Sequence, residues 1–400
     1  MSSGTGLSLD ALFATRAKAF REGPDWAPEP EGTISISFGF ADPEHFPVAE
    51  IIEATAEVLA EDVNGALNYG PTYPGLVRLV VDRLKTRGVA HAAPSNVMIS
   101  YGSSQILALL PQIMVDPGDV VIVEGPCFMG AVRSFQEAGA KIETVPVRAD
   151  GMDIDILAQL LADLTQQGIR PKFIYTTPTY QNPTGTLMPL ANRKRLVALA
   201  AQYGVLILED DAYGDLRFEG EALPKLIALD TDGWVLNCGT FSKILAPGVR
   251  MAWACGPEAV IKRLQKFKVE GSSGPFLTRM VERFAADGRL DAHIAELNEN
   301  YRHKRDVMLA AIARELPADV TYTVPQGGFF IYLYLPADMP AAAVLAKGRE
   351  CGVTALSGVG CYANGQGANE MRLAFSYQPE DKLVEGIRRL GAAMKAARSQ

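Results

Sequence analysis

The sequence predicts an α/β fold, in which a large domain built on a mostly parallel sheet with helices on both faces is joined to a smaller α+β domain. From about residue 48 to 285, helical patterns alternate with short, continuously apolar runs. Such runs predict strands that are covered on both faces, because a half-exposed strand alternates apolar and polar residues. After about residue 286 the pattern changes to a long polar helix, an aromatic-rich strand and a final helix, which predicts the second domain.

Size and composition set the number of domains. The 400 residues are 48% hydrophobic, which is enough to bury a large core and a modest second one. We therefore expect an N-terminal arm and loop over residues 1–47 that pack with the small domain. After this arm we expect a large domain over residues 48–285 and then a small C-terminal domain over residues 286–400.

The individual elements come from the same patterns. The arm holds a short amphipathic helix, Leu9 to Phe20, and then a proline-rich stretch. The clearest strands of the large domain are Val120–Val123, Phe173–Tyr175, Val205–Leu208 and Trp234–Leu236. In the small domain, a polar helix from Asp291 to Leu316 precedes a strand from Phe329 to Leu335.

Charge and cysteine content exclude several classes of protein. The formal net charge is −8, and lysine and arginine are scattered along the chain, so we expect neither nucleic acid nor anionic lipid as a partner. Five widely spaced cysteines form neither a CxxC pair nor a metal-ligand cluster, which predicts a reduced protein without a bound metal. The start of the chain lacks the apolar core of a signal peptide, and no stretch is long enough to span a bilayer. We therefore expect a cytoplasmic protein.

The strongest chemical signal is the segment from Gly239 to Arg250, GTFSKILAPGVR, which follows a predicted strand. Its hydroxyls and backbone N–H groups can hold a phosphate, and Arg250 can bind one through its planar guanidinium. Lys243 can form an imine with a carbonyl compound. Taken alone, the segment is equally typical of a surface loop with ordinary charges.

A second signal is a buried strand that ends in three acidic residues and a tyrosine, LILEDDAY, from Leu206 to Tyr213. Successive side chains of a strand face opposite sides, so Asp210 and Asp211 cannot both point into one pocket. Ligands bind at the carboxyl ends of parallel strands, where this cluster falls. Capping of a helix by either aspartate explains the segment nearly as well.

Two further segments carry weaker signals. The segment from Thr176 to Gly185, TTPTYQNPTG, directly follows an apolar strand, and its proline, asparagine and glycine could merely form a turn. The segment from Ser100 to Leu107, SYGSSQIL, opens a helix with small residues whose free N–H groups can bind a phosphate. An ordinary helix N-terminus looks the same, so neither segment decides the function by itself.

These four segments, in this order, resemble the class I and II aminotransferases of fold type I, enzymes that depend on pyridoxal 5′-phosphate (PLP). The resemblance is strongest to the branch of 2-aminoadipate, aromatic and kynurenine-type aminotransferases, and it runs from about Ile34 to the final helix. It implies transfer of an amino group between an α-amino acid and a 2-oxo acid, with ping-pong kinetics, in a homodimer. The large domain would then bind PLP.

The resemblance also implies roles for individual residues. Lys243 would hold PLP as a Schiff base and move the α-proton of the substrate. Asp210, three residues before Tyr213 as in the family pattern, would pair with the protonated pyridine nitrogen of PLP. Asn182 and Tyr213 would donate hydrogen bonds to the phenolate oxygen of the cofactor.

The remaining cofactor contacts follow from the same resemblance. Phe128 would stack on the ring of PLP, and Tyr69 would reach a phosphate in the neighbouring subunit, so the active site would require a dimer. The phosphate cradle would consist of Gly102, Ser103, Ser104, Thr240, Ser242 and Arg250.

Two segments match the substrate contacts of the family. Arg372, in NEMRLAFS, would bind the α-carboxylate through two parallel hydrogen bonds, and Gly39 lies in a loop that would pass over the substrate. The chain departs from the family where Ala41 replaces a common proline and where Ser357 precedes Gly358 in place of Pro-Gly. Both departures lie beside the substrate, so they bear on specificity and reaction type.

Two alternatives remain open at this point. Elimination or substitution at the β or γ carbon, or a PLP-dependent oxidation, would begin with the same adduct between PLP and the amino acid, formed when the substrate amine displaces Lys243. A regulatory PLP-binding module would carry a winged DNA-binding head, but only about 33 residues precede the domain and the chain is acidic, so we expect an enzyme.

Overall fold

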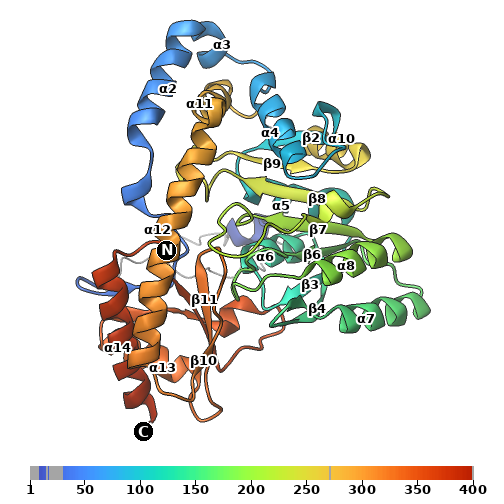
Figure 1. Cartoon of the computed structure of the whole chain (residues 1–400). Coiled ribbons are helices and arrows are strands. Elements are labelled where there is room, and N and C mark those ends of the chain that lie inside the picture. Colours follow the sequence, from blue (N-terminus) through green and yellow to red (C-terminus); the bar gives the residue numbers. More distant parts are fainter. Residues whose placement is uncertain (1–8, 15–16, 18–29, 270–271, 399–400) are drawn as a thin grey trace, which may run out of the picture.

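The computed structural model describes residues 9–14, 17, 30–269 and 272–398, and they form a large and a small α/β body around two main sheets (Figure 1). The predicted helix from Leu9 to Phe20 lies partly outside these residues, and all of the proline-rich stretch except Pro30 lies outside them. The part that is described holds one 3₁₀ turn, η1 (Leu9–Leu12).

The large sheet has eight strands, most of them parallel. In order across the sheet they are β2 (Val97–Ser100), β9 (Ala252–Cys255), β8 (Val235–Thr240), β7 (Leu206–Asp211), β6 (Phe173–Thr176), β3 (Val120–Gly125), β4 (Lys141–Arg148) and β5 (Gly151–Met152). Strands β8, β7, β6, β3 and β4 run parallel, while β9 is antiparallel to both of its neighbours. The mostly parallel sheet agrees with the prediction from continuous apolar runs.

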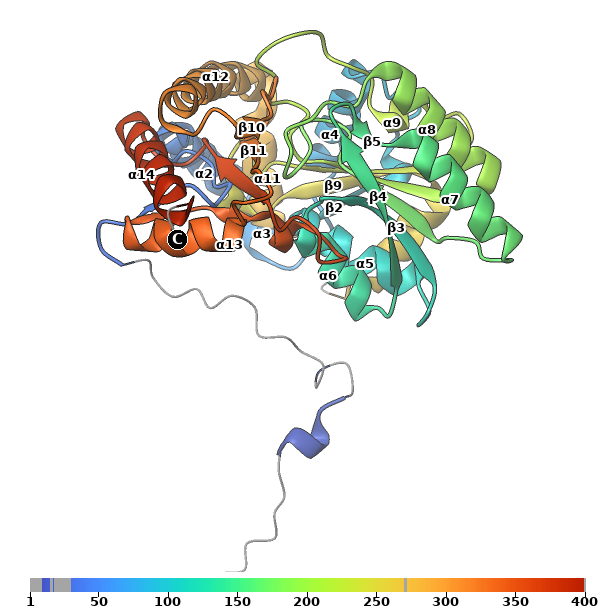
Figure 2. The ribbon, with the colours of Figure 1, turned by 90° about the horizontal axis from the view of Figure 1, so that it is seen from below.

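Helices cover both faces of this sheet (Figure 2). One face carries α5 (Ser103–Met114), α6 (Met129–Glu137) and α10 (Glu258–Phe267), which share a core with Val121, Val123, Leu206 and Leu208. The other face carries α4 (Pro74–Thr86), α7 (Ile154–Gln166), α8 (Leu190–Tyr203) and α9 (Leu226–Leu229), which pack on Ile122, Ile174 and Ile207. Alternate residues of one strand therefore enter different cores, as the period of two requires.

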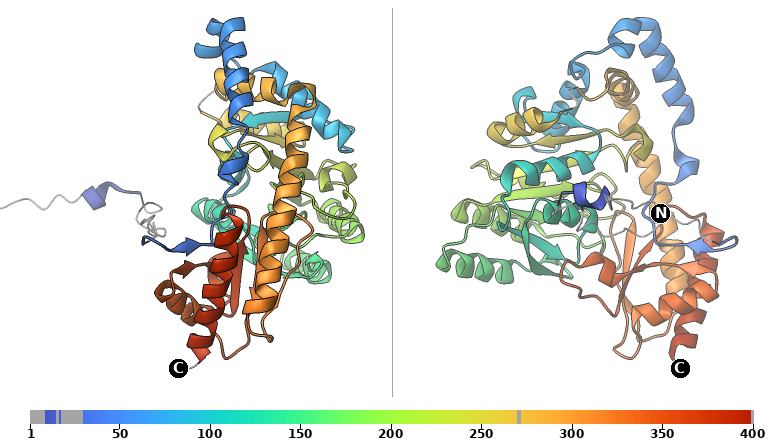
Figure 3. Two further views of the ribbon diagram at one scale, coloured as in Figure 1. Left: turned by 60° about the vertical axis from the view of Figure 1, so that its left-hand side comes forward. Right: turned by 180° about the vertical axis from the view of Figure 1, so that it is seen from behind.

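The small body is an antiparallel sheet backed by helices. Its strands lie in the order β10 (Thr321–Tyr322), β11 (Phe330–Tyr334), β14 (Glu370–Ala374) and β13 (Leu356–Ser357). Its helices are α13 (Ala341–Glu350) and α14 (Glu380–Arg398). The long helix α12 (Arg289–Glu315) packs along α14 and extends towards the large body (Figure 3).

The segment before the large body pairs with the small one. Strand β1 (Ile34–Ser35) runs parallel to β12 (Val353–Thr354). It leads through η2 (Pro43–His45) into α2 (Val48–Glu61) and α3 (Val63–Leu67), which pack on α11 (Pro275–Ala285). The remaining 3₁₀ turns are η3 (Pro94–Asn96), η4 (Pro247–Val249), η5 (Ala286–Gly288) and η6 (Gly358–Cys361). We propose to keep the division at 48 and 286, because α2 opens the large body and α12 begins at Arg289.

Candidate active site

The predicted cofactor residues lie at the carboxyl edge of the large sheet. Phe128 follows β3, Asn182 follows β6, Asp210 lies near the end of β7, and Lys243 follows β8. Parallel strands bring their carboxyl ends to one edge, so residues separated by more than a hundred positions meet there. Both Asp210 and its neighbour Asp211 belong to β7 rather than capping a helix.

Lys243 lies under the loop that contains Gly39. Its Nζ donates a hydrogen bond to the carbonyl of Gly39 at 3.0 Å and lies 5.4 Å from the ring centre of Phe329 and 6.0 Å from that of Tyr213. Burial, with the nearby charge of Arg372, lowers the pKa of Lys243 to about 8, against a smaller opposing effect of Asp210. A lysine with a pKa near 8 has much more of its amine in the neutral, nucleophilic form at neutral pH than an exposed lysine.

Asp210 is a buried carboxyl group that uses only one of its two oxygens in hydrogen bonds among the described residues. Its Oδ2 accepts a hydrogen bond from the hydroxyl of Tyr175 at 2.8 Å, while Oδ1 is buried without a hydrogen-bond partner among the described residues. Burial raises the pKa of Asp210 to about 6, with a smaller lowering by Tyr175. An orphaned buried acceptor of this kind fits a protonated ring nitrogen, which would satisfy it. Asp211 faces away and pairs with Lys225.

Arg372, on β14, joins the two bodies at the site. One NH group donates to Oδ1 of Asn182 at 3.0 Å and another to the carbonyl of Ser37, and the guanidinium lies 4.3 Å from the ring centre of Phe330. Its Nε has no partner among the described residues. The same Phe330 ring closes on Gly39, where an added Cβ would lie 2.5 Å from the ring. A side chain at position 39 would therefore force the buried Phe330 ring or the loop to shift.

The residues expected to hold the phosphate lie around Arg250. Gly102 has φ +74°, and a Cβ added there would collide with the Arg250 guanidinium, so the missing side chain leaves the room that Arg250 occupies. Arg250 itself has a left-handed backbone, φ +51°, which is uncommon outside glycine and clusters at functional sites. Ser103 and Ser104 form the first turn of α5, where free N–H groups favour anions.

The hydroxyls of the lysine segment form a small network. Thr240 Oγ1 donates to Ser242 Oγ at 3.0 Å and accepts from the Ser242 N–H at 3.1 Å. Tyr213 packs edge to face on Phe329 and Phe330, and burial raises the pKa of its hydroxyl. Its hydroxyl therefore stays protonated and able to donate at neutral pH.

Two predicted residues stand apart from this cluster. Phe128 is partly exposed just before α6, with its ring over Gly130. Tyr69 is fully exposed after α3, as a residue that serves another subunit would be in a single chain. One departure from the family pattern lies beside Arg372, because Leu356 pairs with Arg372 and Ser357 with Met371 across β13 and β14. The other, Ala41, is buried two residues after Gly39.

Several residues of the site were missed by the sequence interpretation. The sequence places Tyr175 only within an apolar strand, yet its hydroxyl donates to Oδ2 of Asp210. Glu124, at the end of β3, accepts hydrogen bonds from Thr176, from the Thr177 N–H and from Gln181, the residue before Asn182. Burial raises the pKa of Glu124 to about 7. These contacts hold the loop that presents Asn182.

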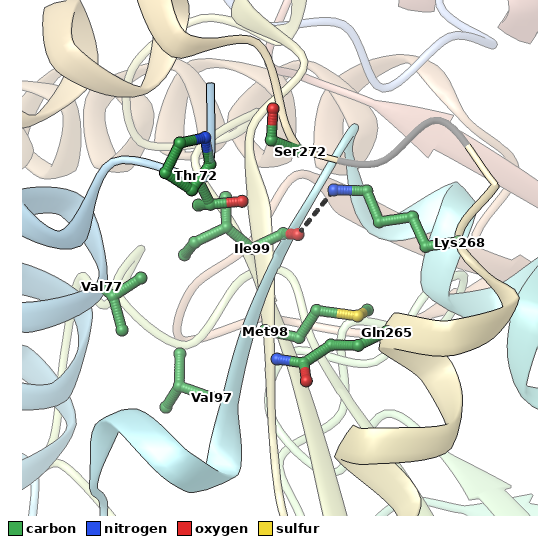
Figure 4. Close-up of a pocket in the computed structure, with 9 residues that line it drawn as sticks. Thr72, Val77, Val97, Met98, Ile99, Gln265, Lys268 and Ser272 are labelled. Carbon is green, nitrogen blue, oxygen red and sulfur yellow. Dashed lines mark hydrogen bonds between the residues drawn. The ribbon is translucent and has the colours of Figure 1, made fainter. Parts of the chain in front are cut away.

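A separate cavity of about 280 Å³ lies between α4, β2 and α10 (Figure 4). Lys268 extends into it and donates to the Ile99 carbonyl at 3.2 Å. None of the predicted site residues lines this cavity, so it is distinct from the site at the carboxyl edge of the sheet.

Comparison with known proteins decides the family. The family model for class I and II aminotransferases matches residues 33–390. The chain belongs to the class I and II aminotransferases.

Several named aminotransferases are similar to this chain over nearly its whole length. It is 36% identical to aromatic-amino-acid aminotransferase 1 of Thermococcus litoralis, over 92% of this chain and 89% of that protein. Kynurenine aminotransferase of Pyrococcus horikoshii, solved with PMP, has a TM-score of 0.92 and 33% identity, over 97% of this chain and 98% of that one. α-Aminoadipate aminotransferase of Thermus thermophilus, complexed with N-(5′-phosphopyridoxyl)-L-leucine, has a TM-score of 0.90 and 34% identity, over 98% and 100%.

These similarities establish the reaction class and the cofactor. The protein is a PLP-dependent aminotransferase of fold type I, as the sequence predicts. Among the described residues, no helix combines the length and apolar character needed to cross a membrane. The unpartnered Asp210 oxygen, the low pKa of Lys243 and the Arg250 guanidinium beside Gly102 fit a group that carries a ring nitrogen, a carbonyl and a phosphate.

Proposed function

We propose that Lys243, Asp210 and Arg372 are the central residues of the amino-group transfer, each acting on a different part of the reacting complex. When bound, PLP supplies a carbonyl that reacts with amines and a ring that withdraws electrons. Lys243 holds it covalently at rest and, once its amine is released, moves the proton of the substrate α-carbon through Nζ. Asp210 holds a proton on the ring nitrogen through its free Oδ1, and Arg372 orients the substrate through its carboxylate.

One observation carries this proposal: Lys243 and Arg372 both bond the loop of Gly39, Asp210 lies close enough to Lys243 to affect its pKa, and each of the three lacks a full set of partners among the described residues. Within the described part of the chain, Lys243 Nζ donates to one carbonyl, Asp210 Oδ1 has no partner and Arg372 Nε has none. Buried polar groups are normally satisfied, so several incomplete groups in one place indicate ligands that complete them.

We further propose aromatic and large apolar amino acids as donors, with a 2-oxo acid as acceptor. Phe38 and Phe40, on either side of Gly39, stack with ring centres 5.2 Å apart, and Tyr377 packs edge-on against Phe40. Residues 34–47 contain no lysine or arginine that could bind a second carboxylate. The relatives named for aromatic amino acids and kynurenine support the same class.

The test is to mix the PLP-loaded enzyme with single amino acids and follow the visible spectrum of the cofactor. We expect aromatic donors to convert it faster than aspartate or glutamate, without an acceptor present. Adding a 2-oxo acid should restore the starting spectrum, as ping-pong kinetics require. Release of ammonia instead of retention of the amino group would indicate elimination rather than transamination.

Arg250 provides a first prediction, on cofactor affinity. Arg250→Ala should weaken PLP binding by about tenfold to a hundredfold, because a charge-assisted hydrogen bond contributes about 1.5–3 kcal/mol. Turnover at saturating PLP should change much less. Fluorescence titration of the PLP-free protein measures the dissociation constant, and Arg263→Ala, on the exposed face of α10, is the control. An unchanged dissociation constant would mean that Arg250 does not bind the phosphate.

Asp210 provides a second prediction, on stability. Its pKa is about 6 in the folded protein against an ordinary 3.8, so stability of the PLP-free protein is lost as pH rises from about 4 to about 6. Asp210→Asn should remove that loss and stabilise the PLP-free protein at pH 7.5 by up to roughly 3 kcal/mol, with little change at pH 4. Denaturation midpoints at both pH values test this. Equal gains at the two pH values would contradict the assigned cause.

We also propose a homodimer with shared active sites in the reducing cytoplasm. Exposed apolar residues on α2 and α3, namely Val48, Ile52, Val63 and Leu67, lie in the same part of the chain as the exposed Tyr69. Such a group of apolar side chains is typical of a subunit interface. All five cysteines are free thiols, which suits a reducing compartment.

A third prediction tests the shared site by complementation. Tyr69→Ala and Lys243→Ala should each be impaired at limiting PLP. In a mixed dimer, one site carries both defects and the other carries neither, so mixing the variants should recover about a quarter of wild-type activity. If Tyr69 served its own subunit, no mixture would contain an intact site and activity would not recover. Scattering measurements establish the mass of the assembly independently.

A further inference from the structure

A buried ion pair lies beneath the loop that contains Gly39, and neither of its residues has been given a role in the proposed reaction. Lys304, on α12, donates to Oδ2 of Asp42 at 2.6 Å, and both residues are only 4% exposed. Desolvating two charges opposes folding, and an apolar pair of similar size would often be as stable. Such a pair therefore points to a role in fixing one particular arrangement.

The Asp42 carboxylate fixes one end of the loop that contains Gly39. Besides Lys304 it accepts from Asn300 Nδ2 at 3.0 Å and from the Glu44 N–H at 3.2 Å, and its Oδ2 lies 3.2 Å from Nδ1 of His45. The Asp42 N–H donates to the hydroxyl of Tyr301, also on α12. Helix α12 thus holds the loop three residues beyond Gly39.

Lys304 has a second contact, with the segment that follows β14. Its Nζ donates to the carbonyl of Ser376 at 3.2 Å, and the Ser376 hydroxyl donates to the carbonyl of Phe40 at 2.6 Å. Ser376 lies four residues after Arg372. One ammonium group therefore contacts both the loop of Gly39 and the segment that directly follows the strand of Arg372.

We propose that Lys304 is a positioning residue, which holds the loop that presents Gly39 to Lys243 in register with the strand that carries Arg372. This inference rests on the proposed function, because it assumes that Lys243 and Arg372 handle the substrate. Loss of the ammonium group would let the loop and the strand move apart. The substrate would then find its carboxylate site and its reacting amine less well aligned.

The test compares Lys304→Met with Lys382→Met, the same substitution at an exposed position of α14. In Lys304→Met we expect KM for amino donors to rise by about tenfold or more, with kcat and the PLP dissociation constant changed far less. Hydrogen exchange of residues 35–46 should accelerate by about tenfold or more, with PLP or without it. If Lys304 were purely structural, Lys304→Met would lower the melting temperature but leave both the KM and the hydrogen exchange of this loop unchanged.

A second variant covers the case in which Lys304→Met does not fold. Asp42→Asn keeps the shape of the carboxyl group and removes its charge, and it should show the same rise in KM. The double variant should be clearly less impaired than the product of the two single effects, because both substitutions remove the shared contact. Multiplied effects, or a folded Lys304→Met with wild-type KM and exchange, would overturn the proposal. If Arg372→Ala also left the KM of the amino donor unchanged, the proposed function would have failed instead.

Discussion

Lys243→Ala should carry no covalently attached PLP and should lose at least about a thousandfold in turnover, because general acid–base catalysis alone commonly contributes 10²–10⁴. The amine of Lys243 is the only one that the structure places beneath Gly39 and beside the orphaned Asp210, among the described residues. Borohydride reduction followed by mass spectrometry of the intact protein measures the attachment. We expect one added PLP per chain in the wild type and none in the variant.

Two control variants separate chemistry from charge. Lys243→Arg keeps a cation near Asp210 but cannot attach PLP, so it should be as inactive as the alanine variant. Lys262→Ala removes an exposed lysine that only pairs with Glu258 on α10, and it should behave as wild type. PLP that remains reducible onto the protein in Lys243→Ala would assign the attachment to another lysine.

Local chemistry explains why much of the site could be predicted from sequence. Lys243 and Arg250 lie within one short segment, and Asp210 is recognisable at the end of an apolar strand, so each leaves a signal in consecutive residues. The parallel sheet then brings these segments together at its carboxyl edge. The order of strands does not need to be known for that conclusion, because all the parallel strands end at the same edge.

The contacts that could not be predicted join residues far apart in the chain. Tyr175 meets Asp210 because β6 and β7 are neighbours, with Tyr175 in register with Leu208, two residues before Asp210. Lys304 and Asp42 are separated by most of the sequence and meet only when α12 packs beneath the loop. Neither tyrosine in an apolar strand nor lysine on a polar helix differs locally from an ordinary structural residue.

Strand ends also differ from the prediction, for a related reason. The predicted strands Val205–Leu208 and Trp234–Leu236 continue as β7 to Asp211 and as β8 to Thr240. Acidic and small polar residues normally lower the strand propensity. Here they are buried, and hydrogen bonds such as that from Asn237 Nδ2 to Glu209 partner several of them, while Oδ1 of Asp210 stays without a partner among the described residues. The functional residues therefore extend the strands that apolar patterns alone would end.

Arg372→Ala should lose most of its activity towards amino acids while keeping bound PLP. Removing a charge-assisted pair and leaving a carboxylate poorly compensated costs on the order of 2–5 kcal/mol in kcat/KM, which is about thirtyfold to several thousandfold. The Phe330 ring holds the plane of the Arg372 guanidinium, and Arg372 Nε has no partner among the described residues, so it can donate to a carboxylate. Arg372→Lys keeps the charge without the planar pair of donors, so it should fall between wild type and alanine.

The decisive comparison is between an amino acid and the amine that lacks its carboxylate. Phenylalanine and phenylethylamine form such a pair, and single-turnover changes in the cofactor spectrum measure both substrates with each protein. The loss in Arg372→Ala should fall mainly on phenylalanine, because the amine never used the guanidinium. The PLP dissociation constant serves as a check, since Arg372 also donates to Asn182 and its loss could disturb the cofactor. Equal proportional losses for the two substrates would assign Arg372 to holding Asn182 and the Ser37 carbonyl, and the carboxylate would then require another partner.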